Sequence, residues 1–130
     1  MQTRTLPRLA FNVPSIARKT AAEVERVLGR PDKSSSTWLG GKVKQTYHRG
    51  AVEVVFVGGR AEWIKIFETR GLPFNQQALT KLGLPPRKPT YVNRDRVMSW
   101  GNICNLREVS LYSGGSNSVS YVLVCAHAAP

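Results

Sequence analysis

The stretch from Lys42 to Phe67 reads KVKQTYHRGAVEVVFVGGRAEWIKIF and predicts a three-stranded antiparallel meander. Apolar and polar residues alternate over residues 42–48, which is typical of a strand with one solvated face. Residues 51–57 are rich in β-branched side chains, and the Gly-Gly pair at 58–59 tolerates the positive φ of a tight hairpin turn. Residues 61–67 then form the returning strand.

A short helix is expected just before this meander. Thr20 can accept a hydrogen bond from the backbone of Glu23 while the Glu23 carboxylate reaches back, which is a capping box. Gly29 suits the left-handed position that ends a helix, and Pro31 cannot continue one. The sequence therefore predicts a helix over about residues 20–29 with a positive φ at Gly29.

The same order of signals recurs in the second half of the chain. A second helix is expected over 75–83, where Gly83 takes a positive φ, and it is followed by a Pro-Pro stop. Three further strands are expected at residues 97–104, 107–112 and 118–126. Residues 32–41 and 87–96 are expected to be loops.

This recurrence predicts an α+β fold in which two tandem αβββ units form one antiparallel sheet with the helices on one face. Residues 1–19 are interpreted as a basic N-terminal arm with an extended segment near Phe11–Ile16. Residues 20–70 form the first unit and residues 71–130 the second, within a single compact domain.

The segment Ser15–Asp32 resembles the opening helix of the SmpA/OmlA (BamE-like) family, because its helix ends in Leu-Gly-Arg-Pro. The tandem arrangement is similar to the fold of the β-lactamase-inhibitor protein. This resemblance implies a non-enzymatic scaffold that holds protein partners on its sheet face or loops. The chain departs from the family in being strongly basic and in lacking a lipoprotein cysteine near its start.

The charge balance indicates the kind of partner. The 19 Lys and Arg against 8 Asp and Glu give a net charge of +11, and such an excess attracts polyanions and acidic surfaces. We expect a non-enzymatic inhibitor or adaptor that engages an acidic protein through a basic sheet and loop surface. The alternative is a nucleic-acid-binding module that uses basic patches and sheet aromatics.

We expect the binding residues on the first strand of the meander and in the loop between the two units, where cations lie beside tyrosines. These candidates are Lys42, Lys44, Tyr47, Arg49, Arg87, Lys88, Tyr91, Arg94 and Arg96. If the units share one sheet face, both groups would form one positive surface. Trp63, Phe67 and Trp100 are expected in the core.

No catalytic or metal-binding constellation stands out, so we expect no enzymatic activity, no cofactor and no metal site. Cys104 and Cys125 are interpreted as buried small hydrophobes, with a disulfide as the alternative. The sequence shows no secretory signal or spanning segment, which predicts a cytoplasmic protein, or a secreted one if this chain is trimmed from a longer precursor. The oligomeric state is left open.

Overall fold

A computed structural model describes residues 11–37, 42–94, 96–115 and 117–126. Over these residues the fold is mostly β, with one antiparallel sheet of eight strands and two short α-helices. The elements in chain order are η1 (Val13–Ser15), α1 (Ala21–Leu28), β1 (Lys33–Thr37), β2 (Lys42–Tyr47), β3 (Val52–Val57), β4 (Arg60–Ile66), α2 (Gln77–Lys81), β5 (Tyr91–Asn93), β6 (Val97–Ile103), β7 (Leu106–Gly115) and β8 (Ser118–Ala126).

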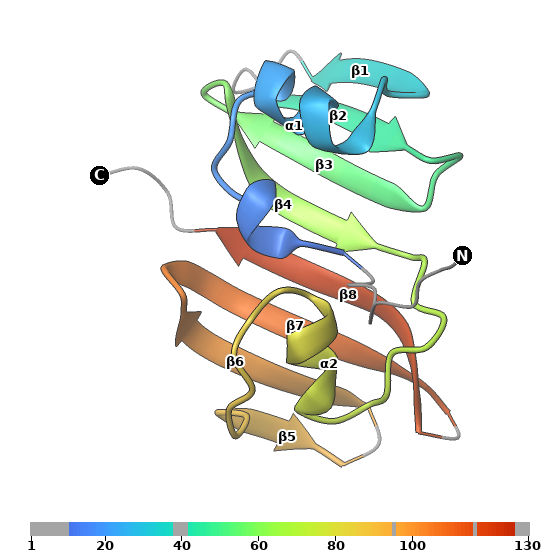
Figure 1. Ribbon diagram of the computed structural model, residues 1–130, viewed down its shortest axis with the longest axis vertical. Helices are drawn as coiled ribbons and strands as arrows, with labels where there is room; N and C mark the ends of the chain where they lie inside the picture. Colours follow the sequence, from blue (N-terminus) through green and yellow to red (C-terminus); the bar gives the residue numbers. More distant parts are fainter. Residues whose placement is uncertain (1–10, 38–41, 95, 116, 127–130) are drawn as a thin grey trace, which may run out of the picture.

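The strand order is β1-β2-β3-β4-β8-β7-β6-β5, and every neighbouring pair is antiparallel (Figure 1). Each half of the chain is a helix followed by a four-stranded meander. The last strands of the two meanders, β4 and β8, pair in the middle of the sheet, with Ile64 opposite Val124 and Ile66 opposite Val122. The two halves are therefore joined edge to edge through the last strand of each meander.

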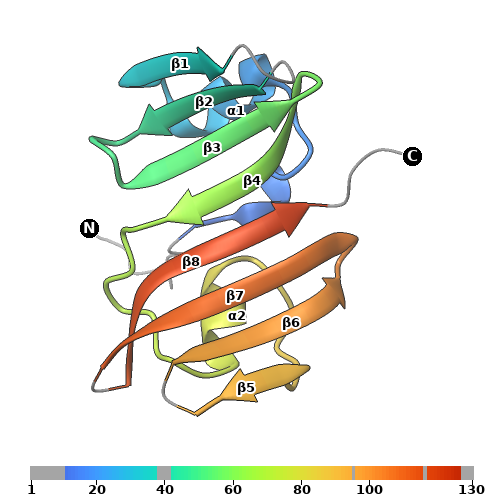
Figure 2. The same cartoon turned by 180° about the vertical axis from the view of Figure 1, so that it is seen from behind.

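The helices α1 and α2 and the turn η1 lie on one face of the sheet (Figure 1), and no helix of the described residues covers the opposite face, which is seen from behind in Figure 2. The core forms between the sheet and this helical layer. Val54 and Ile64 of the first half and Val109 and Val124 of the second half are fully buried there. Within the described residues, no helix has the length and apolar character needed to cross a membrane.

The segment Phe11–Lys19, which we expected to be part of a basic arm, is packed into the core. Val13 and Ile16 are fully buried, and the stretch expected to be extended contains the 3-10 turn η1. Its backbone bonds to both halves, because the Val13 N–H donates to the Leu82 carbonyl (2.9 Å) and the Arg18 N–H to the Ala61 carbonyl (2.8 Å). Residues 1–10 lie outside the described residues.

The signals for the first helix are confirmed. Thr20 and Glu23 form the capping box, which lowers the pKa of the Glu23 carboxyl through hydrogen bonds from the Thr20 backbone and side chain. Gly29 has the expected positive φ (+91°), but its ψ of −172° lies outside the left-handed helical region. Gly83 also has a positive φ (+81°).

Two strands appear in segments that we expected to be loops, so each half has four strands instead of three. These are β1, within residues 32–41, and β5, within residues 87–96. Both are edge strands that pair on one side only, and β1 reads Lys-Ser-Ser-Ser-Thr without apolar alternation. The helix α2 is also shorter than the expected 75–83, and its first residue, Gln77, donates its N–H to the Asn75 side chain.

Gly29 gives a test of this helix ending. Its φ and ψ fall in a region that is essentially confined to glycine, while a Cβ placed there would meet nothing within 4 Å. Gly29→Ala should therefore lower the free energy of unfolding by about 1–3 kcal/mol through backbone strain alone. Urea denaturation measures the change.

The matched control is Gly58→Asn in the β3–β4 turn. Gly58 (φ +62°) and Gly59 (φ +84°) form a two-residue hairpin turn whose first position favours asparagine. Gly58→Asn should leave the unfolding free energy nearly unchanged. Equal losses from both substitutions would contradict the strain at Gly29.

Candidate functional site: the open face of the sheet

The bare face of the sheet carries the side chains that alternate with the buried ones. Successive side chains of a strand point to opposite faces, so the register of the ladder defines the rows on this open face. One row reads, from β7 to β1, Glu108, Cys125, Trp63, Val55, Lys44 and Ser35. The next row reads, from β5 to β1, Tyr91, Ser99, Ser110, Leu123, Lys65, Glu53, Thr46 and Lys33.

Four aromatic side chains, which we call the aromatic cluster, lie on this face; three of them contact one another, and Trp63 stands apart from these three on β4. They are Trp63, Phe67, Tyr112 and Tyr121. The Tyr112 and Tyr121 rings stack with centroids 4.5 Å apart and an interplanar angle of 10°, and the Phe67 ring lies 6.0 Å from Tyr121. Trp63 is 38% exposed and Phe67 46% exposed. Large apolar surface therefore faces solvent where no helix covers it.

Cations lie within and beside the aromatic cluster. The Lys65 Nζ lies 5.8 Å from the Tyr121 ring centroid and 6.0 Å from that of Phe67, within the range of a cation–π contact. The Lys44 Nζ lies 3.0 Å from a carboxylate oxygen of Glu53 on the neighbouring strand. Lys65 is therefore a cation in direct contact with the exposed rings.

A hollow of about 330 Å³ opens in the centre of this face. Its walls come from three adjacent strands and are lined by Glu53, Val55, Trp63, Lys65 and Leu123. The floor is aliphatic, one wall is the Trp63 indole, and the two charged groups lie at its sides. The hollow can accept one apolar side chain, and Lys65 can pair with an acid beside it.

The predicted binding residues are divided between the two ends of the sheet. Lys44 lies on the open face of β2, whereas Tyr91, 55% exposed, lies on the open face of β5 at the far edge. Six strand spacings of about 4.8 Å, or about 29 Å, separate these two strands. The single positive surface that we expected from the first strand and the loop does not form.

The other predicted cations are all exposed, and all but Lys42, the first residue of β2, lie in turns and connections. Arg49 lies in the β2–β3 turn, and Arg87 donates from its guanidinium to the Gly101 carbonyl (2.9 Å). The remaining predicted cations, on the open face of β2 or around β5, are Lys42, Lys88, Arg94 and Arg96.

Tyr47 does not belong to a surface site. It alternates with Lys44 and so faces the helices, where it is fully buried and donates its hydroxyl to the Gln45 side chain (2.6 Å). Burial raises the pKa of Tyr47 to about 12, with a smaller contribution from the negative charge of Glu25. Trp100 is buried as expected, but Trp63 and Phe67 are not core residues.

The sequence did contain a signal for the aromatic cluster. Trp63 and Phe67 are two residues to either side of Lys65, so a period of two places all three on the same face of β4. The alternating Ile64 and Ile66 mark the buried side. The pairing of Phe67 with the tyrosines of β7 and β8 depends on contacts between distant strands, which no local pattern reveals.

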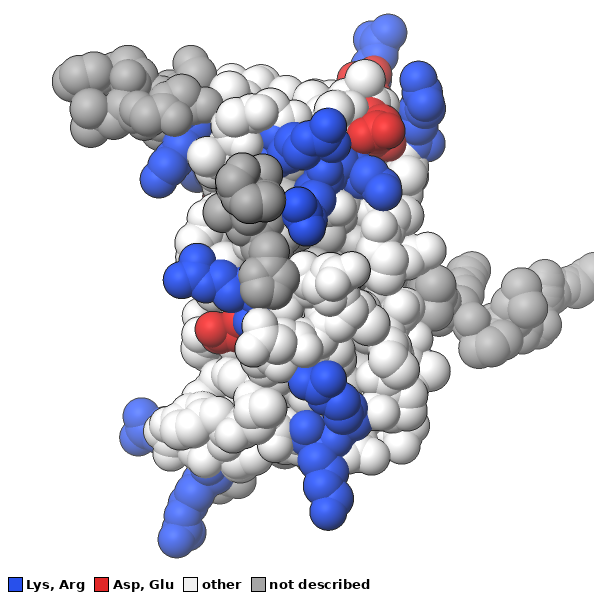
Figure 3. All heavy atoms as spheres, turned by 90° about the vertical axis from the view of Figure 1, so that its left-hand side faces the viewer, with Lys and Arg blue, Asp and Glu red and all other residues white. Residues whose placement is uncertain are grey.

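A further concentration of cations lies at one end of the strands (Figure 3), where Lys and Arg gather with few acidic side chains. Arg60, at the start of β4, donates from its guanidinium to the Arg18 carbonyl (3.1 Å), which places it beside Lys19. Cys104 is exposed in the β6–β7 turn nearby, and Cys125 is buried on β8. Both cysteines are free, and burial raises the pKa of the Cys125 thiol.

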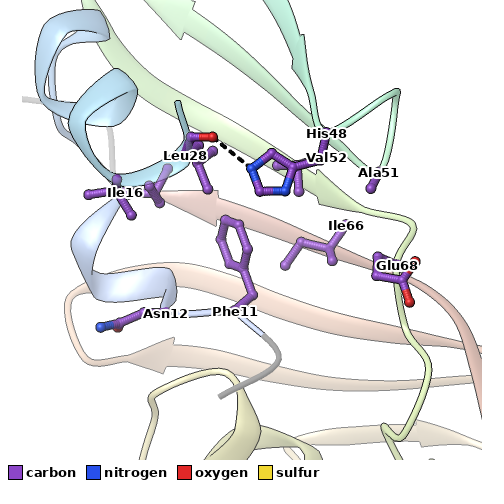
Figure 4. A pocket seen from close by; sticks show the side chains of 10 residues that line it. Phe11, Asn12, Ile16, Leu28, His48, Ala51, Val52, Ile66 and Glu68 are labelled. Carbon is purple, nitrogen blue, oxygen red and sulfur yellow. Dashed lines mark hydrogen bonds between the residues drawn. The ribbon is translucent and has the colours of Figure 1, made fainter. Parts of the chain in front are cut away.

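The helical side carries a second hollow of about 330 Å³ (Figure 4), lined mainly by apolar residues such as Phe11, Ile16 and Ile66. His48 lies at its rim with its Nε2 2.6 Å from the Leu28 carbonyl oxygen. Because a carbonyl oxygen only accepts, Nε2 carries the hydrogen and satisfies the end of α1. We therefore assign His48 a structural role. No group of three His, Cys, Asp or Glu able to hold a metal occurs in the described part of the chain.

No protein-family model and no curated protein matches the chain. Among solved structures, it is similar to an extracellular protein containing an SCP domain from Bacillus anthracis str. Ames, with a TM-score of 0.57 and 8% sequence identity. The similarity covers 97% of this chain and 49% of that chain, so this chain spans about half of its length. At this identity the likeness concerns the fold alone.

The raised pKa of Tyr47 predicts a loss of stability at alkaline pH. The folded state keeps the Tyr47 proton up to about pH 12, while the unfolded chain releases it near the ordinary pKa of 10. The stabilising contribution is therefore complete below pH 10 and is lost as the pH rises toward 12. Burial also raises the pKa of Tyr112, so ultraviolet titration should show Tyr47 ionising last, near pH 12, and Tyr47→Phe should remove this last step. A step near pH 12 that persists in the variant would contradict the assignment.

Proposed function

We propose that this protein is a non-enzymatic binding protein, an inhibitor or adaptor, which holds an acidic protein partner on the open face of its sheet. The observation that carries the proposal is the exposed aromatic cluster with Lys65 among its rings. The residues assigned from the sequence, Lys42 and Lys44, then contribute cations to the side of this surface. The proposal includes no catalytic residue and no cofactor.

The composition of the open face supports a protein partner. Protein interfaces are enriched in aromatic residues at their centre, and a few such residues in desolvated pockets supply most of the binding free energy. Trp63 lines the central hollow, and Phe67 extends the apolar surface toward the tyrosines. The lysines on the face and the net charge of +11 favour a partner of negative charge.

We infer that the chain consists of two tandem units of one helix and one meander, each with four strands. Support comes from the identical order of elements in the two halves and from the antiparallel pairing of β4 with β8, which a two-fold relation between units would require. The resemblance of residues 15–32 to the SmpA/OmlA family, and of the pair to the β-lactamase-inhibitor protein, belongs to the same proposal.

Two cellular locations are compatible with the proposed binding. A cytoplasmic protein is the prediction from the sequence, whereas the similar solved structure is of an extracellular protein, which supports the secreted alternative. Binding by the open face requires only that the acidic partner share the compartment.

A nucleic acid is the second candidate partner, and one observation favours it. Exposed rings beside lysines on an uncovered sheet are also the arrangement on which single-stranded bases stack. Nucleic-acid binding should weaken steeply as salt rises, because bound cations release counterions from the phosphates. Fluorescence polarisation with random single-stranded DNA and RNA at two salt concentrations measures this dependence.

If a protein binds this face, the double variant Trp63→Ala/Phe67→Ala should have a much lower affinity for that protein. Truncating central aromatic residues should weaken binding by about 2 kcal/mol or more, which is about thirtyfold in Kd. Immobilised wild-type and variant proteins are compared by quantitative mass spectrometry of the proteins retained from an extract of the source cells. Acidic proteins should be retained by the wild type and lost from the double variant, while the melting temperature changes little.

Two control variants distinguish binding by the open face from non-specific retention through exposed apolar side chains or through net charge. Val27→Ala removes an equally exposed apolar side chain (50%) from α1, on the other side of the sheet. Lys65→Glu reverses a charge on the open face, and Arg26→Glu reverses one on α1. Retention should fall with Lys65→Glu and persist with Val27→Ala and Arg26→Glu. Equal loss in all variants would overturn the proposed site.

A further inference from the structure

The open face contains a second, polar hollow that the aromatic cluster does not use. It has a volume of about 240 Å³ and lies at the β5 end of the sheet, where it is lined by Thr90, Tyr91, Ser99, Gly101 and Glu108. Gly101 on β6 stands opposite Glu108 on β7, so a missing side chain leaves the space beside the carboxylate. A Cβ at Gly101 would lie 3.8 Å from the Thr90 hydroxyl oxygen, so any longer side chain would enter the hollow.

A chain of hydrogen bonds fixes the polar groups of this hollow. Ser110 is the fully buried polar side chain of the described residues, and it donates its hydroxyl to Glu108 Oε2 (2.6 Å). Its single hydrogen is thereby used, so the Ser99 hydroxyl is the donor in the 2.8 Å contact between the two serines. Ser110 holds both the Glu108 carboxylate and the Ser99 hydroxyl in place.

The groups that remain available to a ligand are almost all acceptors. Ser99 has used its hydrogen and offers lone pairs, and the second carboxylate oxygen of Glu108 has no hydrogen-bond donor among the described residues. The Thr90 hydroxyl donates to the Ser99 carbonyl and accepts from the Gly101 N–H, which uses its hydrogen as well. A ligand for this site must bring several donors.

The exposed Tyr91 ring provides the apolar wall. It is 55% exposed and stands next to Ser99 across the β5–β6 ladder, so a flat apolar surface borders the row of acceptors. A sugar ring has the complementary shape, with hydroxyl donors around its edge and C–H groups on its faces that pack against an aromatic ring. An ion of either sign fits less well, because Glu108 repels anions and the net charge of +11 repels cations.

We propose that the hollow formed by Tyr91, Ser99, Gly101 and Glu108 binds a neutral saccharide. Tyr91 stacks against one face of the sugar ring, Glu108 and Ser99 accept hydrogen bonds from two of its hydroxyls, and Ser110 acts as a positioning residue beneath them. The site is shallow and a single ring offers few contacts, so the Kd for a short oligosaccharide lies in the millimolar range. The inference does not depend on the proposed protein partner, since it uses other residues of the face.

The experiment is a titration of the ¹⁵N-labelled protein with maltotriose, cellotriose and chitotriose, followed by NMR of the backbone amides. At least one of the three sugars should shift the amides of Ser99 and Gly101 in a saturable manner. Tyr91→Ala and Gly101→Val should each weaken this binding at least about tenfold, which corresponds to about 1.4 kcal/mol. The matched control is Val92→Ala, because Val92 is 49% exposed on the same short strand but points to the opposite face.

A Ser110→Ala variant and a titration with methylguanidinium test the sugar site further. Ser110→Ala keeps the lining of the hollow but releases Glu108 and Ser99, so it should weaken sugar binding while the spectrum remains that of a folded protein. Methylguanidinium, a planar cation rich in donors, tests the competing class of ligand. Saturable binding of methylguanidinium without binding of any sugar would overturn the proposal. So would the absence of shifts with all three sugars, or an equal loss of binding in Val92→Ala.

Discussion

The antiparallel pairing of β4 with β8 is the contact on which the remaining structure depends. Each meander alone would have an apolar strand at its edge, and this pairing places both strands in the interior of an eight-stranded sheet. It also creates the middle of the open face, since Trp63 and Lys65 come from β4, Phe67 follows β4 directly, and Tyr121 comes from β8. Without this ladder, neither the aromatic cluster nor the central hollow would exist.

The segment Phe11–Lys19 reinforces this pairing from the helical side. It bonds to the end of α2 through Val13 and to the start of β4 through Arg18, so one short stretch of chain contacts both halves. Its buried Val13 and Ile16 complete the core above the central strands. The helical layer is therefore continuous across the junction, and the opposite face can remain bare without loss of the core.

The sequence predicted the elements that depend on local chemistry. The capping box at Thr20, the glycine at 29 and the hairpin at 58–59 are properties of neighbouring residues, and all were found. The edge strands β1 and β5 were missed because they bury little and depend on their partner strands. For the site, charge indicated Lys44 but misplaced Tyr47, whose phase along β2 opposes the lysines. The Ser99–Ser110–Glu108 chain joins two strands at a register that only the folded sheet defines.

The position of Lys65 has a consequence for the behaviour of the protein in concentrated solution. Exposed apolar rings on an uncovered sheet favour face-to-face association with a second copy of the chain. In such a pair, the central lysines of both copies would be brought together in a dry interface that could not solvate them. A charge set among the rings thus disfavours the homodimer while leaving the surface open to a molecule that carries an opposite charge at that point.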